Sequence, residues 1–148
     1  MDNTRPSTKK KPADEQDIEI TLKEVMAPFL PPGVYTVGFK RGENRFMWKR
    51  EIIILWFAIC DEGDWFGREL FMSCSVPKDG RWTLNFKFVR NWMLAAGRRP
   101  DRLDRLSTKV FRGKWFQAKV KTVLKTAKGE QLIDHARYSV IDELTSKI

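Results

Sequence analysis

Hydrophobic and polar positions alternate with a period of two through most of the chain, which is typical of β-strands with one buried face. From this alternation and from the turn residues between the runs, the sequence predicts five strands, over residues 33–41, 46–60, 68–76, 114–125 and 131–141. The turn 42–44 is expected to join the first two strands as a hairpin. The second strand becomes apolar on both faces between Ile52 and Ile59, so we expect it to be covered on both sides or to curl into a closed structure.

Between the third and fourth strands the period changes to that of a helix. Val89 and Met93 belong to an apolar stripe at helical spacing, which predicts a helix over 86–96 with Gly97 as its C-terminal stop. A second, short helical turn is expected to begin at Asp101, which would cap it.

The order of these elements predicts a fold class. Three strands, a helix and two further strands make an all-β protein with one inserted helix, the order of an OB-fold, in which five strands form a small barrel. The length of 148 residues suits one such domain, which we place at 30–148. Residues 1–29 are expected to form a flexible tail, although 18–30 is ambiguous between a short strand and a helix.

Charge is distributed unevenly along the chain. The formal net charge is +9, yet residues 78–137 alone contain 16 Lys or Arg against 5 Asp or Glu, a net of +11. Such asymmetry favours a nucleic acid or another anionic surface as the partner, but does not choose between them.

The predicted fourth strand has two chemically different faces. One face is apolar and carries Phe116, Ala118, Val120, Thr122 and Leu124. The other carries Trp115, Gln117, Lys119, Lys121 and Lys125. Because a solvated strand needs polarity but no particular sign, repeated lysine beside tryptophan favours an anionic polymer with stackable bases over a merely soluble surface.

OB-folds bind oligonucleotides across strands two and three, between the loops that join strands one to two and four to five. Both loops are basic here. The candidate nucleic-acid contacts are therefore Arg41, Arg45, Phe46, Trp48, Lys49, Arg50, Trp115, Lys119, Lys121, Lys125 and Lys128. Most of the 6 Trp and 10 Phe must be core, and Trp56 and Trp92 are expected there because their neighbours are apolar.

Four short runs mark the starts and ends of these elements. They are Leu30-Pro31-Pro32-Gly33-Val34-Tyr35, Gly67-Arg68-Glu69-Leu70-Phe71, Ala95-Ala96-Gly97 and Phe111-Arg112-Gly113-Lys114. With them the chain resembles, over roughly residues 30 to 145, the small OB-fold single-stranded-DNA-binding proteins encoded beside replication genes in phages and mobile genetic elements. The resemblance implies sequence-tolerant single-strand binding in DNA replication or recombination. The chain departs from many bacterial single-strand binders in ending without an acidic tail, so recruitment of repair enzymes through such a tail is not expected.

Catalysis, cofactors and metals find little support in the sequence. The chain has no glycine-rich phosphate loop followed by Lys-Ser or Lys-Thr, and His135 is its single histidine. Cys60 and Cys74 are expected to be reduced, buried thiols, with a disulfide left open. The acidic run 61–64 is interpreted as a solvated turn rather than a cation site. We expect no enzyme activity, no cofactor and no membrane segment, and a cytoplasmic location.

Two other functions remain open at this point. A protein-binding adaptor would use exposed aromatic residues to dock a replication helicase or primase, with the charge serving only solubility. An RNA-binding module, for double-stranded RNA or a ribosome, would use the same positive charge.

Overall fold

The computed structural model describes residues 17, 19, 28–47, 49–126 and 128–148. Its elements are β1 (Gly33–Met47), β2 (Arg50–Ile59), β3 (Glu69–Ser75), α1 (Lys87–Ala96), the 3-10 helix η2 (Thr108–Phe111), β4 (Trp115–Val123), the 3-10 helix η3 (Asp134–Ala136) and β5 (Tyr138–Lys147). The predicted five strands and the helix between the third and fourth are thus confirmed. The expected N-terminal tail and most of the ambiguous segment after it lie outside the described residues.

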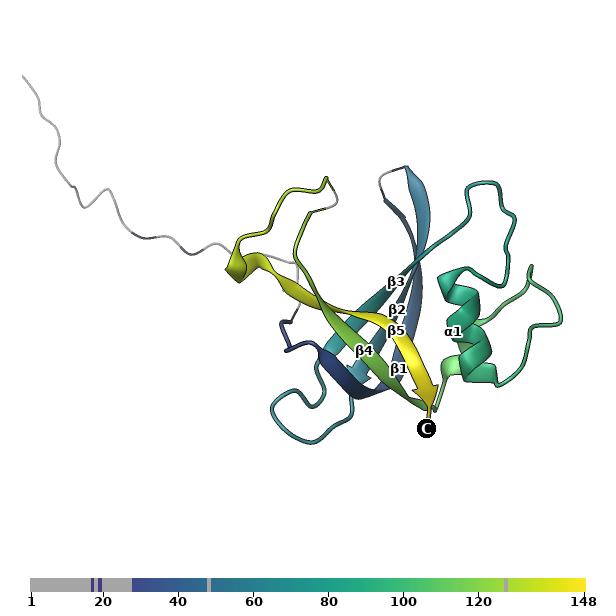
Figure 1. Cartoon of the computed structure of the whole chain (residues 1–148), viewed down its shortest axis with the longest axis horizontal. Coiled ribbons are helices and arrows are strands. Elements are labelled where there is room, and N and C mark those ends of the chain that lie inside the picture. Colours follow the sequence, from purple (N-terminus) through teal and green to yellow (C-terminus); the bar gives the residue numbers. More distant parts are fainter. Residues whose placement is uncertain (1–16, 18, 20–27, 48, 127) are drawn as a thin grey trace, which may run out of the picture.

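The five strands form one antiparallel sheet in the order β3-β2-β1-β4-β5 (Figure 1). β1 is long enough to pair with β4 through its first half and with β2 through its second, and a β-bulge between Phe39 and Arg41 bends it between the two. Among the described residues no backbone ladder joins β3 to β5, so the sheet is not closed. These end strands still approach each other, because the rings of Phe71 and Tyr138 lie 6.4 Å apart.

The position of the first hairpin turn differs from the prediction. Residues 42–44 have the composition of a turn, but they continue β1, with Gly42 opposite Leu55, and the chain reverses only after Met47. Lys49 has a positive φ of 61°, which suits the turn that precedes β2. Pairing with the apolar strand β2 therefore overrides the local turn signal, so β1 is longer than the predicted 33–41 and β2 is shorter than the predicted 46–60.

Two further boundaries were wrong. The last strand begins at Tyr138 rather than at residue 131, because 131–137 contain η3 and a loop. The helical turn expected at Asp101 is not formed, and the helical residues appear later, in η2, where the Ser107 hydroxyl accepts a hydrogen bond from the backbone N–H of Lys109. This turn is both capped by Ser107 and packed against the core, where Phe111 is buried.

The core lies between the inner face of the sheet and α1. The helix buries Phe88, Val89, Trp92 and Ala95, and Gly97 ends it in a left-handed conformation, as predicted from the sequence. The helix contacts β3 and β5, the two strands between which the sheet is open (Figure 1). α1 therefore covers the core at this opening.

Residues 28–30, which precede β1, are hydrogen-bonded to β5. The hydroxyl of Ser139 accepts a hydrogen bond from the Leu30 N–H at 2.7 Å and donates one to the Leu30 carbonyl at 2.9 Å. Both residues are buried, so this pair fixes the entry of the chain into β1. In the part of the chain that the structure describes, no helix is long and apolar enough to cross a membrane.

Candidate nucleic-acid interface

The sheet carries a row of aromatic side chains on its outer face, opposite the core. Leu55, Phe57 and Ile59 of β2 belong to the core, so Trp56 points outward, and the same alternation turns Phe71 of β3 outward. The ring centroids of Trp56 and Phe71 are 5.3 Å apart, and Tyr138 of β5 continues the line. We call Trp56, Phe71 and Tyr138 the outer aromatic row. All three are partly exposed, so a planar ligand has access to them.

An arginine and two glutamates fix the indole of Trp56. The guanidinium carbon of Arg41 lies 4.7 Å from the centroid of the indole ring, and its Nη1 is 2.9 Å from Oε1 of Glu69. The indole N–H donates a hydrogen bond to the Glu43 carboxylate. This hydrogen bond is the main cause that holds the pKa of Glu43 below its ordinary value, with the nearby charge of Arg45 adding to the effect. Arg41 is therefore a cation already placed on the surface where a base could stack.

Further cations flank the row from the β1–β2 hairpin. Arg45 lies opposite Ile52 on the outer face, 3.3 Å from Glu43, and remains partly exposed. Arg50 donates a hydrogen bond to the hydroxyl of Ser75 at 3.1 Å, which places it beside the end of β3. Arg45, expected in the connection between the first two strands, thus lies in β1 together with Arg41.

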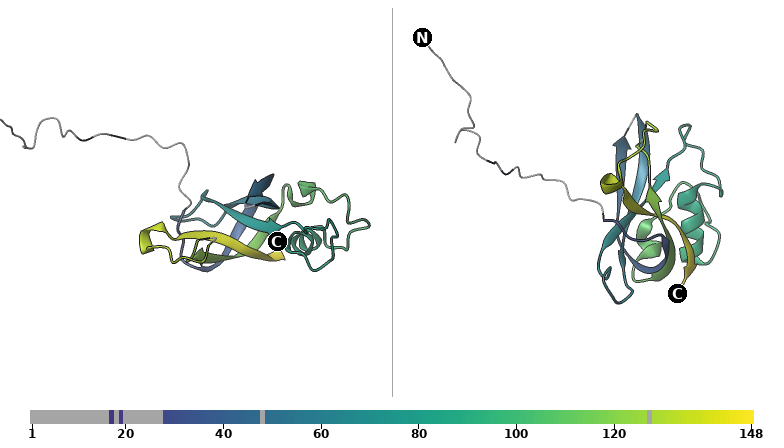
Figure 2. Two further views of the ribbon diagram at one scale, coloured as in Figure 1. Left: turned by 90° about the horizontal axis from the view of Figure 1, so that it is seen from above. Right: turned by 60° about the vertical axis from the view of Figure 1, so that its left-hand side comes forward.

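The outer aromatic row runs between two projecting segments. The β1–β2 hairpin and the β4–β5 connection project from the same side of the sheet, as two views related by rotation both show (Figures 1 and 2). Trp56 stands at the base of the first segment, and Tyr138 follows directly after the second. Lys125, paired with Gln131 in an isolated bridge, and the exposed Lys128 belong to this second segment.

β4 presents the predicted cationic face. Its burial alternates as expected at Phe116, Ala118 and Val120, which are buried. The predicted apolar face does not extend to Leu124, which is 46% exposed because β4 ends at Val123 and this residue lies in the following connection. On the opposite face Trp115 is 57% exposed and stands beside Gly38, where a Cβ atom would come 3.5 Å from its ring. The outward-facing polar residues are Gln117, which donates to the Thr36 hydroxyl at 3.2 Å, the exposed Lys119, and Lys121, which pairs with Asp142 at 3.1 Å. Both lysines are exposed, and the charge of Lys121 is partly neutralised by Asp142.

The remaining predicted contacts lie at the hairpin end. Phe46 is 74% exposed and alternates with Arg45, so it faces the other side of the hairpin from the outer aromatic row. Lys49 is exposed in the turn, and Trp48 lies outside the described residues. The structure thus brings Arg41 and Arg45 to the row, and it places Phe46 elsewhere.

The three members of the outer aromatic row were not predicted from the sequence as contacts. Trp56 was expected in the core because both of its neighbours are apolar, and Trp92 indeed is buried. The parity of β2 contains the signal, since Trp56 shares its face with Ile52 and Ile54 and not with Leu55. The alternation within β2 does not by itself show which of its two apolar faces meets the core. That assignment depends on how β2 pairs with β1 and β3.

Other chemistry is weakly represented in the described residues. No group of three His, Cys, Asp or Glu side chains there could hold a metal ion, and His135 is exposed in η3. Both cysteines are free, and burial raises the pKa of Cys74 to about 11 and raises that of the partly buried Cys60. Neither thiol is activated as a nucleophile, because the thiolate is the reactive form.

Comparison with known proteins adds no family assignment. A scan against protein-family models and a search of curated protein sequences each found no match to this chain.

Proposed function

We propose that this protein binds single-stranded nucleic acid, DNA foremost, without strong sequence preference, across the outer aromatic row. The observation that carries the proposal is the row itself: three partly exposed rings in line on one sheet face, with an arginine stacked at one end. Bases of any sequence have a π-face, and stacking on such a ring contributes ~1 to 3 kcal/mol per base.

The strand order supports an OB-type barrel as the scaffold. The order β3-β2-β1-β4-β5, with the helix between β3 and β4, is that of an OB barrel opened between its third and fifth strands. In this class of fold, oligonucleotides lie across strands two and three between the two loops that here are basic. The outer aromatic row occupies the corresponding surface.

The polar groups around the row suit phosphates rather than base edges. Arg41, Arg45 and Arg50 offer charged donors along the first half of the face, and Lys125 and Lys128 do so beyond Tyr138. In α1, the α-helix of the described residues, Asn91 is not available to read a base, because it is buried and accepts a hydrogen bond from the Leu144 N–H at 3.0 Å. Affinity should therefore depend on charge and stacking, with little discrimination among sequences.

The biological role we propose is protection or presentation of single strands during replication or recombination of a phage or mobile element. This part of the proposal rests on the sequence resemblance. Docking of a helicase or primase remains a second candidate, favoured by exposed apolar side chains on two connections: Phe66 is 64% exposed and Ile133 is 73% exposed.

A titration with matched single-stranded and duplex oligonucleotides at two salt concentrations tests the function. We expect tighter binding to the single strand, similar affinity for different sequences, and a fall of log affinity with log salt of ~0.7 for each phosphate contacted. Equal or tighter binding to the duplex would contradict the proposal. Absence of binding, together with capture of a purified replication helicase or primase, would favour the adaptor.

A further inference from the structure

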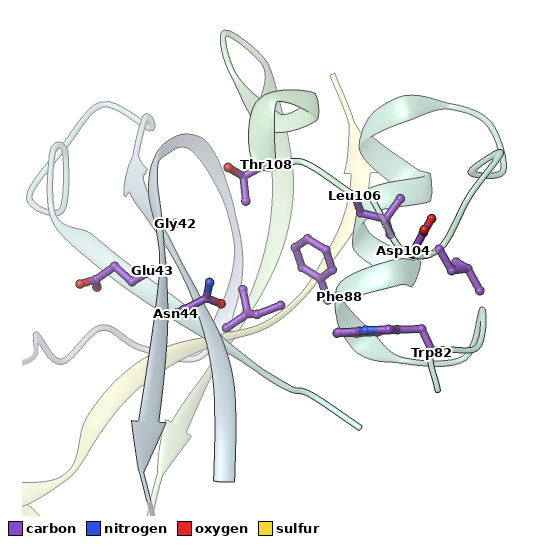
Figure 3. A pocket seen from close by; sticks show the side chains of 10 residues that line it. Gly42, Glu43, Asn44, Trp82, Phe88, Asp104, Leu106 and Thr108 are labelled. Atoms are coloured by element: carbon purple, nitrogen blue, oxygen red, sulfur yellow. The ribbon is translucent and has the colours of Figure 1, made fainter. Parts of the chain in front are cut away.

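A pocket lies on the other side of the β1–β2 hairpin from the outer aromatic row. It has a volume of about 390 Å³ and lies between the inner side of the hairpin and the connections on either side of α1 (Figure 3). Gly42, Asn44 and Ile53 line it from the hairpin. The opposite wall is formed by Trp82, Phe88, Leu103, Asp104, Leu106 and Thr108. Its volume falls within the ~300 to 1,000 Å³ that ligand pockets occupy.

Aromatic and amide groups give this pocket the chemistry of a base-binding site. Trp82 packs edge-on against Phe86, with centroids 5.5 Å apart, and lies 6.1 Å from Phe88, so its ring is held in place. Asn44 extends into the hollow from the opposite strand (Figure 3). An aromatic wall facing an amide suits a planar group that has both hydrogen-bond donors and acceptors.

The two acidic residues of the pocket are both neutralised. Asp104 is 2.7 Å from the guanidinium of Arg102, and Glu43 extends away from the hollow toward Trp56 and Arg45 (Figure 3). This pairing and orientation reduce the repulsion of an anionic ligand by the two carboxylates.

Two exposed cations are next in sequence to residues that line the pocket. Arg105 lies between the lining residues Asp104 and Leu106, and Lys109 follows the lining residue Thr108. Both are exposed, and no carboxylate of the described residues forms an ion pair with either. Exposed, unpaired cations beside an aromatic pocket favour a phosphate-bearing ligand over a neutral one.

We propose that this pocket is a second single-strand site, which takes one unstacked nucleobase on Trp82 while Arg105 and Lys109 contact the adjoining phosphates. The inference rests on the proposed function, since it assigns the same class of ligand to a separate groove. The hairpin stands between the two sites, so one chain would hold two separate segments of single strand, one on each side.

Native mass spectrometry with an excess of a short oligothymidylate tests this directly. The strand should have about six nucleotides, near the lower end of the ~4 to 16 that one such domain covers, so that it does not reach both sites. We expect a complex of one chain with two strands. Arg105→Gln with Lys109→Gln should weaken the second binding event by about fivefold or more and leave the first within about twofold.

A further variant of the pocket and a control variant complete the test. Trp82→Leu, checked by thermal melting, should also weaken the second event. The charge-matched control Arg68→Gln with Arg90→Gln should retain both events, since neither residue lines the pocket or is next in sequence to a residue that does, unlike Arg105 and Lys109. A parent chain that never binds more than one strand would overturn the second site and leave the proposed function intact. A parent that binds no strand would overturn both, and loss of both events together in the Arg105 and Lys109 variant would show a single shared site instead.

Discussion

Replacing Phe71 with leucine should weaken single-strand binding while the chain stays folded. Phe71 is the middle member of the outer aromatic row, 5.3 Å from Trp56 and 6.4 Å from Tyr138 by ring centroids. Leucine keeps an apolar side chain on this face but offers no π-face to a base. The loss of one stacking platform is worth ~1 to 3 kcal/mol, which corresponds to about a 5- to 150-fold rise in Kd.

The cost to stability should be smaller and measurable. The substitution removes two aromatic pairs, each worth ~0.5 to 1.5 kcal/mol, so the two together contribute ~1 to 3 kcal/mol. Because Phe71 is partly exposed, we expect the loss of stability to lie in the lower half of this total, about 1 to 2 kcal/mol. For a domain of this size each kcal/mol lowers Tm by roughly 2 to 4 °C. A fall of several degrees, with a chain still fully folded at the temperature of the titration, is therefore expected.

Fluorescence anisotropy with a labelled single strand, at two salt concentrations, measures the effect on binding. The salt slope should stay that of the parent, because no cation has been removed. Phe66→Leu is the matched control, since this ring is 64% exposed on the β2–β3 connection and is not a member of the row, and it should bind as the parent does. A folded Phe71→Leu chain with parental affinity would refute the assignment of the row.

Three more predictions follow from the same face and from the core behind it. Arg41→Gln with Arg45→Gln should reduce the salt slope by about one to two contacts, at ~0.7 each, and an unchanged slope in the same titration would exclude both as phosphate contacts. Ser139→Ala should destabilise the chain by roughly 2 to 3 kcal/mol in urea unfolding, because it leaves a buried N–H and a buried carbonyl without partners, and a loss near zero would contradict this. The pKa of Glu43 is lowered by the indole N–H of Trp56, so this hydrogen bond should be complete at neutral pH and be lost only as pH falls through the folded-state pKa. The indole NMR signal of Trp56 should follow that transition with a midpoint below the ordinary value for a glutamate, and a midpoint at or above it would contradict the structure.

Much of the fold was predictable because its signals are local and repeated. Alternation located all five strands, and the change of period located α1 to within a residue of its observed start. Gly97 was recognised as the helix stop because its left-handed conformation suits glycine. These features depend on short stretches of sequence and on little else.

The errors arose where pairing between distant segments decides the structure. Residues 42–44 look like a turn, but their partners in β2 hold them extended. Closure between β3 and β5 was likewise not readable from the sequence, and the sheet is open there. The identity of the outer aromatic row depends on the same long-range register, because Trp56 lies in a strand that is apolar on both faces.

Photo-crosslinking maps the proposed interface most directly. A single strand that carries a photoreactive uracil is irradiated with the full-length chain, and the crosslinked peptides are identified by mass spectrometry. The account predicts crosslinks at Trp56, Phe71 and Tyr138 that decline when salt is raised and disappear with an excess of unlabelled single strand. Specific crosslinks that avoid all three residues, in a chain that binds the strand, would contradict it.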